Sequence, residues 1–303
     1  MSAPLAYLNG RFLPQSAACL PLNDAGFVMG ATVTDLCRTF RFRLFRWADH
    51  LRRFRHGCES ARVPQPLSDD KLTSVAERLV EHNRAFLPPD VDLAVVVFAT
   101  PGVVGYYLGE PGGAGDASPT LGMHTFPLPF RRYRRLFEEG ATLAVPGVRH
   151  VPRACVDPRI KQRSRLHWWL AENEVRAQTP TAMALLLDPD GHVTETAAAN
   201  FLIVMDGVVV SPPATAILGG ISLQVTRELC RQLEVGFAER SLAVADCVAA
   251  DEAMLTSTPF GLAPVRQLEE RTFAAPGPVS ARLMCAWNDV AGLDIGGQIL
   301  AAP

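Results

Sequence analysis

The sequence predicts an α/β protein with two domains. Its 303 residues, 48% of them apolar, can form one large core or two smaller ones, and this length favours two domains. Short apolar stretches of strand length alternate with amphipathic stretches of helical period. The pattern of predicted strands and helices changes near residue 130. We therefore expect a smaller N-terminal α/β domain over residues 1–128 and a larger C-terminal α/β domain over residues 129–303.

The chain begins with a predicted β-hairpin. Residues 5–12 alternate around Asn9 and Gly10, and Asn-Gly is a strong signal for a two-residue hairpin turn. Residues 91–100 are almost continuously apolar and predict a buried strand. The Gly- and Pro-rich residues 101–120 predict a mobile surface segment that connects elements.

Two amphipathic helices are predicted between the hairpin and the buried strand. Asp49 is expected to cap the first helix, which stops before Pro64. Ser68 is expected to cap the second helix, which ends at the prolines near residue 88.

The C-terminal part predicts a second unit of mixed strands and helices. The expected strands lie near residues 141–145, 182–188, 192–196, 200–210 and 251–265, and the expected helices near residues 164–176, 220–234 and 278–290. The sequence contains no repeat, heptad run or dinucleotide-binding glycine motif. The fold is therefore expected to serve small-molecule chemistry.

Composition narrows the classes of partner. A net charge of −2 and a pI near 6.4 give no basic surface for nucleic acid or for anionic lipid. The apolar runs have strand length and the N-terminus lacks a charged segment before an apolar one, so we expect a cytoplasmic protein. The seven cysteines form no Cys-x-x-Cys pair, so neither a disulfide framework nor a metal site is indicated.

One lysine is the leading candidate for a catalytic amine. Only Lys71 and Lys161 are lysines among the 29 basic residues, although arginine cannot lose its proton to become a nucleophile. Lys161 precedes an expected helix among Arg159, Arg163 and Arg165, which disfavour its charged form and lower its pKa. A solvated lysine at a helix start is the commoner alternative in an average chain, and it stays open.

Four further features complete a candidate site, each with a structural alternative. Glu195 precedes small residues that would let a flat ligand approach, or it bonds a nearby amide. The glycines at 219–220 open a helix whose N–H groups could bind phosphate or could form an ordinary cap. The residues at 256–258 end a strand close to such a site. Arg53 could bind phosphate bidentately or be solvated.

Six motifs in order resemble the class IV aminotransferase family, the fold-type IV pyridoxal-phosphate enzymes that include branched-chain and D-amino-acid aminotransferases and aminodeoxychorismate lyase. They are DAGFVMGATVTD, DHLRRF, IKQRSRLHWWL, VTETAAANFLIV, ILGGIS and ADEAMLTSTPFGLAPV. Glu195 follows Lys161 by 34 residues, which agrees with the family's layout. The resemblance covers most of the chain and implies a two-domain fold like that of D-amino-acid aminotransferase, with the coenzyme between the domains.

The resemblance also implies roles for individual residues. Lys161 would bind pyridoxal 5'-phosphate covalently and act as the catalytic base, and Glu195 would pair with the pyridine nitrogen. Arg53 would bind the phosphate, together with backbone and hydroxyl donors at Gly220, Ile221, Ser222, Ser257 and Thr258. The implied partners are an amino donor, an oxo-acid acceptor and a second copy of the chain, without a metal, nucleic acid or membrane.

Departures from the family motifs fall at positions that choose the substrate. Thr34 stands at an aromatic position, Pro101 where an arginine often lies, Leu202 at a second aromatic position and Leu223 at a basic one. The sequence therefore predicts no branched-chain or D-alanine specificity, and an arginine among 38, 41, 43, 163 and 165 is expected to bind a substrate carboxylate. Two alternatives remain, a pyridoxal-phosphate lyase and a non-catalytic binding protein on a degenerate scaffold.

Overall fold

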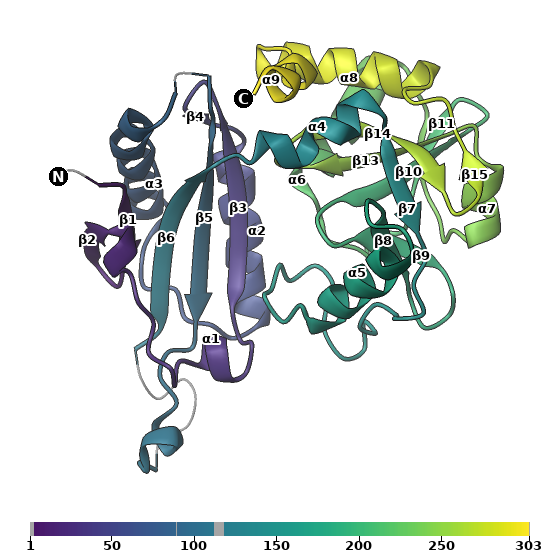
Figure 1. Ribbon diagram of the computed structural model, residues 1–303. Helices are drawn as coiled ribbons and strands as arrows, with labels where there is room; N and C mark the ends of the chain where they lie inside the picture. Colours follow the sequence, from purple (N-terminus) through teal and green to yellow (C-terminus); the bar gives the residue numbers. More distant parts are fainter. Residues whose placement is uncertain (1–2, 89, 112–117, 303) are drawn as a thin grey trace. The chain divides into compact units, whose positions relative to one another are not determined.

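The computed structural model describes residues 3–88, 90–111 and 118–302 (Figure 1). The chain divides into two compact units, one of residues 1–128 with 160–164 and the other of residues 129–159 with 165–303. Lys161 was expected in the C-terminal domain, whereas its segment, Ile160–Ser164, groups with the first unit.

The first unit contains a six-stranded sheet in the order β2-β1-β6-β5-β3-β4, in which every neighbouring pair is antiparallel. Its strands are β1 (Leu5–Leu8), β2 (Arg11–Pro14), β3 (Val33–Phe40), β4 (Arg43–Leu44), β5 (Leu93–Thr100) and β6 (Thr120–Pro127). Its helices are α1 (Ala25–Val28), α2 (Trp47–Ser60) and α3 (Asp69–Asn83), with short 3₁₀ turns η1 (Gln15–Ala17), η2 (Arg84–Phe86) and η3 (Gly105–Leu108).

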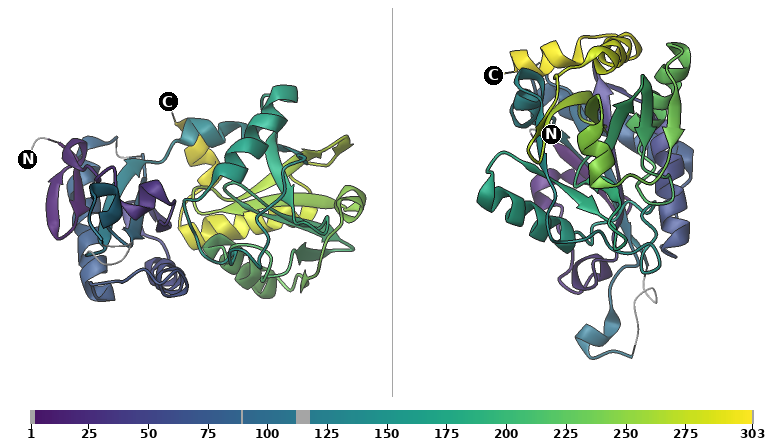
Figure 2. Two further views of the ribbon diagram at one scale, coloured as in Figure 1. Left: turned by 90° about the horizontal axis from the view of Figure 1, so that it is seen from below. Right: turned by 90° about the vertical axis from the view of Figure 1, so that its right-hand side faces the viewer.

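The core of the first unit lies between this sheet and two helices. Helices α2 and α3 cover the same face of the sheet (Figure 1 and Figure 2). Alternate residues of β5, from Leu93 to Ala99, join the helix residues Leu51, Phe54 and Leu72 in one buried cluster. Because side chains alternate along a strand, this spacing places one row of β5 side chains on the helices.

Local sequence signals in the first unit correctly predicted one hairpin turn and one helix cap. Asn9 and Gly10 have φ values of 45° and 88°, as a two-residue hairpin turn requires. Ser68 caps α3 by accepting a hydrogen bond from the backbone N–H of Lys71 at 3.3 Å. The prediction that Asp49 caps α2 is wrong. The helix begins at Trp47, after Arg46 in the left-handed region at φ 54°, and Asp49 lies in its first turn.

The connection predicted over residues 101–120 contains η3, whose Tyr106 and Tyr107 are exposed. Residues 112–117 of this segment lie outside the described residues. The predicted strand over residues 91–100 is confirmed as β5.

The second unit contains a nine-stranded mixed sheet. Its strands are β7 (Ala141–Ala144), β8 (Met183–Leu187), β9 (Val193–Thr196), β10 (Asn200–Met205), β11 (Val208–Ser211), β12 (Phe237–Glu239), β13 (Glu252–Ser257), β14 (Gly261–Leu268) and β15 (Arg271–Thr272). Its helices are α4 (Phe130–Glu138), α5 (Leu166–Gln178), α6 (Ile221–Gln232), α7 (Val244–Ala249), α8 (Pro278–Ala291) and α9 (Ile295–Ala301).

Six strands of the second unit close on themselves. The order β10-β13-β14-β7-β8-β9 is completed by a second pairing of β9 with β10, at Glu195 and Asn200. Helix α5 packs on β8, whereas α6 and α8 pack on β13 and β14 (Figure 1). The ring brings residues from distant parts of the chain to one place, because β9 and β13 both neighbour β10.

Most expected elements of the second unit are present with small shifts at their ends. The expectation of one strand over residues 200–210 is wrong, because a turn at Asp206 and Gly207, both with positive φ, divides it into β10 and β11. An Asp-Gly pair between apolar runs is a hairpin signal. Within the described residues, no helix is long and apolar enough to cross a membrane.

Candidate functional site

The segment that contains Lys161 is attached to the edge of β3. The backbone N–H of Thr34 donates to the Lys161 carbonyl at 2.8 Å, and the N–H of Arg163 donates to the Thr32 carbonyl at 3.1 Å. Ile160 packs against the core of the first unit. These contacts explain why the lysine segment belongs to the first unit, and they fix the backbone from which the Lys161 amine extends.

A second contact fixes the end of the lysine segment. The Ser164 hydroxyl donates to the Gly30 carbonyl at 2.7 Å. Gly30 has a φ of 66°, and a Cβ at this position would lie 2.5 Å from the Ser164 oxygen. Glycine therefore allows the close approach between this turn and the lysine segment.

Asp35 is the centre of a buried charged cluster. Its carboxylate accepts two hydrogen bonds from Arg53, from Nε and Nη2, each at 2.8 Å. The same carboxylate lies 2.7 Å from Nδ1 of His50. Asp35 and His50 are each 1% exposed and Arg53 is 9% exposed, so water screens these charges little. The cluster joins β3 to α2.

The environment sets the protonation states in this cluster. Burial alone would raise the pKa of the Asp35 carboxyl, but the charges and hydrogen bonds of Arg53 and His50 outweigh it and hold that pKa far below its usual value. Burial lowers the pKa of His50, and the nearby cations Arg53 and Lys161 lower it further, against the opposing effect of Asp35. We infer a neutral His50 that donates its Nδ1 hydrogen to Asp35.

Lys161 and Arg53 are thus brought near one another in the first unit. Lys161 is close enough for its charge to affect the pKa of His50, and His50 precedes Arg53 by one helical turn on α2. With an ionised Asp35 and a neutral His50, the charges of Asp35 and Arg53 balance, and Lys161 adds one positive charge when it is protonated. Such a cluster is suited to an anionic group.

Glu195 is the corresponding feature of the second unit. It is 8% exposed, and both of its carboxylate oxygens accept hydrogen bonds. The Asn200 side-chain amide donates to Oε2 at 2.9 Å, and the Leu218 backbone N–H donates to Oε1 at 3.0 Å. These bonds fix the orientation of the carboxylate. Glu195 therefore does bond nearby amides, as the structural alternative drawn from the sequence expected.

The start of α6 is held against the same asparagine. The Asn200 amide also donates to the Leu218 carbonyl at 2.9 Å. A Cβ at Gly220 would overlap Oδ1 of Asn200, so glycine is needed there. Gly220 is the N-cap of α6 and has no side chain to bond the first-turn N–H groups of Ile221 and Ser222. A helix of 12 residues with such an N-terminus favours an anion.

Two predicted phosphate donors lie at the end of β13. Ser257 is buried, and its hydroxyl donates to the Ala198 carbonyl at 2.5 Å, so it positions the loop between Glu195 and Asn200. Thr258 follows in the turn that leads to β14. The neighbouring strands bring both residues and Glu195 into the same part of the second unit, since Thr256 pairs with Asn200.

Three residues of these clusters were not predicted from the sequence. Asp35 and His50 orient Arg53, and Asn200 orients Glu195. The spacing of His50 and Arg53 on one face of a predicted helix was a usable signal. No sequence signal indicated the pairing of Arg53 and His50 with Asp35, because folding alone brings this strand residue and the helix residues together.

The arginines considered for a substrate carboxylate have different environments. Arg38 is 1% exposed, forms an ion pair with Asp92 at 3.4 Å and lies against the Phe40 ring, so it is a core residue. Arg41 and Arg43 are exposed. Arg165 donates to the Ala197 carbonyl, next to the Glu195 loop. Burial lowers the pKa of Arg163, which lies near enough to His124 to lower the pKa of that imidazole.

One acidic group in the described residues has the spacing of a metal site. Asp188, Asp190 and His192 lie at the turn between β8 and β9, and one ligand atom from each falls within 4.8 Å of the others. Oδ1 of Asp188 accepts hydrogen bonds from the backbone N–H groups of Asp190 and His192. This bonding is the ordinary hydrogen bonding of an aspartate in a turn.

We predict that Asp35→Asn destabilises the protein far more than Asp49→Asn. Both aspartates pair with an arginine of α2, but the Asp35–Arg53 pair is buried, whereas the two partners of Asp49, Arg46 and Arg52, are 35% and 72% exposed. Breaking the buried pair leaves Arg53 without its countercharge and costs about 3–5 kcal/mol, against about 0–1 kcal/mol for the exposed pair.

Urea denaturation at pH 7 measures both changes. A carboxyl whose pKa is lowered on folding stabilises the fold above its unfolded pKa, and this stabilisation is lost as the pH falls toward the folded value. The contribution of Asp35 is therefore complete at pH 7. Equal losses of unfolding free energy in the two variants would contradict the role given to Asp35.

The comparisons with known proteins agree on one family. The family model described as amino-transferase class IV matches residues 32–268. A putative branched-chain-amino-acid aminotransferase of Methanocaldococcus jannaschii is 26% identical over 94% of this chain and 95% of its own. A D-alanine aminotransferase of Bacillus licheniformis is 25% identical over 92% of this chain and 94% of its own.

Solved structures share the fold. The branched-chain amino acid aminotransferase of Escherichia coli superposes with a TM-score of 0.86 at 22% identity, over 95% of this chain and 94% of its own. A T.th. branched-chain amino acid aminotransferase, solved with pyridoxamine 5'-phosphate, gives a TM-score of 0.81 at 22% identity, over 96% of this chain and 95% of its own. The chain belongs to the class IV aminotransferase family and is a pyridoxal-phosphate-dependent aminotransferase of fold type IV.

Proposed function

We propose that the chain moves an amino group between an amino acid or amine and an oxo acid, with Lys161 as its catalytic amine. The observation that carries this proposal is the placement of Lys161. Its backbone is fixed by β3, and its charge lowers the pKa of His50, which belongs to the buried cluster of Asp35, His50 and Arg53. A primary amine on a fixed backbone, with an arginine on the neighbouring helix, is what an aldehyde that carries a phosphate requires.

Each unit contains groups of the kinds that pyridoxal 5'-phosphate needs. The coenzyme supplies an aldehyde that accepts the amino group and a protonated ring that withdraws electrons from the reacting carbon. Glu195 is suited to the ring nitrogen, because its carboxylate is buried and oriented by Asn200 and Leu218. The fixed negative charge favours a protonated pyridine nitrogen.

Two features are each suited to a phosphate, Arg53 in the first unit and the start of α6 in the second. Asp35 orients the Arg53 guanidinium by a bidentate ion pair. Gly220 leaves the first-turn N–H groups of Ile221 and Ser222 without a side-chain cap. Thr258 adds a hydroxyl, whereas the Ser257 hydroxyl already donates to Ala198 and contributes through the position of its loop.

Lys161 moves the proton in the reaction. With the coenzyme held by these residues, Nζ of Lys161 would accept the proton from the donor Cα and would later donate a proton. Water would supply the oxygen of the oxo product, and the amino nitrogen would stay on the coenzyme for the acceptor.

The chain departs from the family motifs at Thr34, Pro101, Leu202 and Leu223, and Pro101 follows Thr100 at the end of β5. The Thr34 hydroxyl donates to the Val97 carbonyl at 2.9 Å, and the Thr100 hydroxyl accepts from the Gly102 N–H at 3.1 Å. Leu202 is fully buried and Leu223 is 6% exposed, so neither side chain offers an exposed surface in place of the aromatic or basic group of the family motif. We therefore propose a substrate bound without the arginine of the Thr-Arg-Gly form, and Arg163 or Arg165 as its carboxylate partner.

A homodimer is part of the proposal. Leu166, Trp169 and Leu170 of α5 are 69%, 67% and 50% exposed and recur at helical spacing, so they form one apolar face. A contiguous exposed apolar face marks a protein interface more often than a free surface. We assign this face to contact with a second copy of the chain.

We also propose a cytoplasmic location. All seven cysteines are free thiols in the structure, four of them buried. A reducing compartment keeps thiols in this form, whereas secreted proteins tend to form disulfides.

Substitution of the two lysines tests the catalytic amine. Lys161→Ala is expected to lose the coenzyme that borohydride fixes to the protein and to lower kcat by a factor of roughly 10²–10⁴ or more, since general-base catalysis alone contributes that much. Lys71→Ala changes an exposed lysine on α3 and is the matched control. Peptide mass mapping after borohydride reduction and single-turnover rates are the measurements. Turnover by Lys161→Ala at the wild-type rate would refute the assignment.

Product analysis separates transamination from lyase activity. The purified holoenzyme is incubated with an amino donor in the presence and absence of an oxo-acid acceptor. A transaminase forms the second amino acid and sustains turnover only with the acceptor. A lyase releases its products without it, and this outcome would replace the proposed reaction. A chain that acts on no donor but binds the coenzyme would be a binding protein.

Light scattering tests the dimer. Trp169→Glu places a charge on the apolar face of α5 and is expected to shift the wild-type dimer toward the monomer. Val290→Glu is the control, because Val290 is also exposed, at 41%, but lies on α8. A wild-type monomer, or a Trp169→Glu dimer as stable as the wild type, would exclude this interface.

A further inference from the structure

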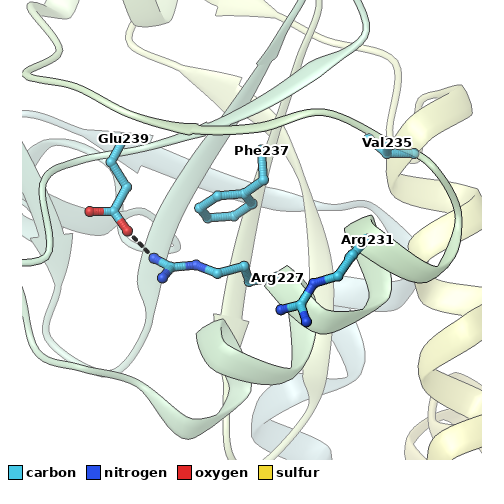
Figure 3. A pocket seen from close by; sticks show the side chains of 5 residues that line it. All are labelled: Arg227, Arg231, Val235, Phe237 and Glu239. Atoms are coloured by element: carbon cyan, nitrogen blue, oxygen red, sulfur yellow. Dashed lines mark hydrogen bonds and ion pairs between the residues drawn. The ribbon is translucent and has the colours of Figure 1, made fainter.

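A pocket with a volume of about 410 Å³ lies on the second unit, between the later turns of α6 and strand β12. Its lining residues are Arg227, Arg231, Val235, Phe237 and Glu239. None of them is among the residues assigned to the coenzyme. Figure 3 shows both arginines extending from the same helix, with the Phe237 ring beside Arg227.

The charges of the pocket do not balance. Arg227 forms an ion pair with Glu239, and the other oxygen of Glu239 accepts a hydrogen bond from the Ala214 backbone N–H at 3.2 Å. Arg231 follows Arg227 by one turn of α6, so the two side chains share a face of the helix. Within the described residues, the Arg231 side chain forms no ion pair or hydrogen bond. The pocket therefore carries one uncompensated positive charge.

The pocket also contains an unused hydrogen-bond donor. Nε of Arg227 is buried, and the described residues offer it no acceptor. A buried polar atom without a partner costs about 1–3 kcal/mol, and a ligand that supplies an acceptor recovers this energy. The donor and the unpaired Arg231 lie along one side of the pocket (Figure 3). An anion with two acceptor oxygens matches this pair.

The remaining lining is apolar and partly flat. Arg227 Cζ lies 4.8 Å from the centroid of the Phe237 ring, so the guanidinium and the ring form a stacked platform. Val235 is buried beside it. A flat hydrocarbon or aromatic group gains contact area and dispersion energy on such a surface.

We propose that this pocket binds an organic anion in which a carboxylate is joined to a flat apolar group. The carboxylate accepts hydrogen bonds from Arg231 and from Arg227 Nε. The flat group lies against Phe237 and Val235. Glu239, held by Arg227 and Ala214, repels a second negative charge, so the ligand carries its anion at one end only. This site is separate from the coenzyme residues and does not depend on the proposed reaction.

Calorimetric titration of the coenzyme-loaded enzyme with 2-naphthoate tests the proposal. The neutral analogue 2-naphthamide keeps the flat group and lacks the charge, and inorganic phosphate keeps the charge and lacks the flat group. Saturable binding of 2-naphthoate is expected, with at least about tenfold weaker binding of the other two probes. Equal binding of 2-naphthamide, or of phosphate, would overturn the proposal.

Variants locate the site, because a carboxylate could also enter the substrate pocket. Arg231→Gln removes a side chain without a partner and is expected to weaken 2-naphthoate binding at least about tenfold, which corresponds to about 1.4 kcal/mol. Phe237→Ala is expected to weaken it as well while leaving phosphate binding unchanged. Arg266→Gln is the control, since Arg266 is an exposed arginine on β14.

The outcomes are distinct. Loss of binding in Arg231→Gln, with wild-type binding in Arg266→Gln and wild-type thermal unfolding in both, supports the site. Wild-type affinity in Arg231→Gln overturns it, because 2-naphthoate then binds elsewhere. Absence of saturable binding to the wild type overturns it too.

Discussion

The pairing of Glu195 with Asn200 is the constraint on which the second unit depends. It joins β9 to β10 and so closes the ring of six strands. The same asparagine then bonds the Glu195 carboxylate and the Leu218 carbonyl, and its Oδ1 leaves no room for a Cβ at Gly220. One residue thus takes part in the closure of the sheet through its backbone, and its side chain orients the acid and fixes the path of the chain into α6.

A buried cluster of charged residues organises the first unit. Asp35 is buried, and its negative charge is stable there only because Arg53 and His50 surround it. A buried ion pair adds little net stability compared with apolar residues, but it imposes a definite geometry on the groups that form it. Here the geometry fixes Arg53 on α2 relative to β3, to which the Lys161 segment is also attached.

Local sequence signals correctly predicted the features that depend only on adjacent residues. The Asn9-Gly10 turn and the Ser68 cap are decided by a few adjacent residues, and both are present. The start of α2 was not predictable, because the left-handed Arg46 follows from the tight hairpin before it. The attachment of the Lys161 segment to β3 and the Asp35–Arg53 pair needed the fold, since both join residues that local patterns do not connect. Residue types and motif order indicated Lys161, Glu195 and Arg53, but not the side chains that orient Arg53 and Glu195.

The attachment of Ile160–Ser164 to the first unit has a consequence for chain connectivity. The chain passes from one unit to the other after residues 128, 159 and 164, so three covalent links join the units. A single proteolytic cut after residue 128 divides the chain into two separate polypeptides, and residues 160–164 of the first unit then remain covalently attached to the second unit. The first unit cannot be expressed whole as one continuous stretch, because residues 129–159 separate its two pieces. The strand edge that holds the lysine is completed only after the ribosome has begun the second unit.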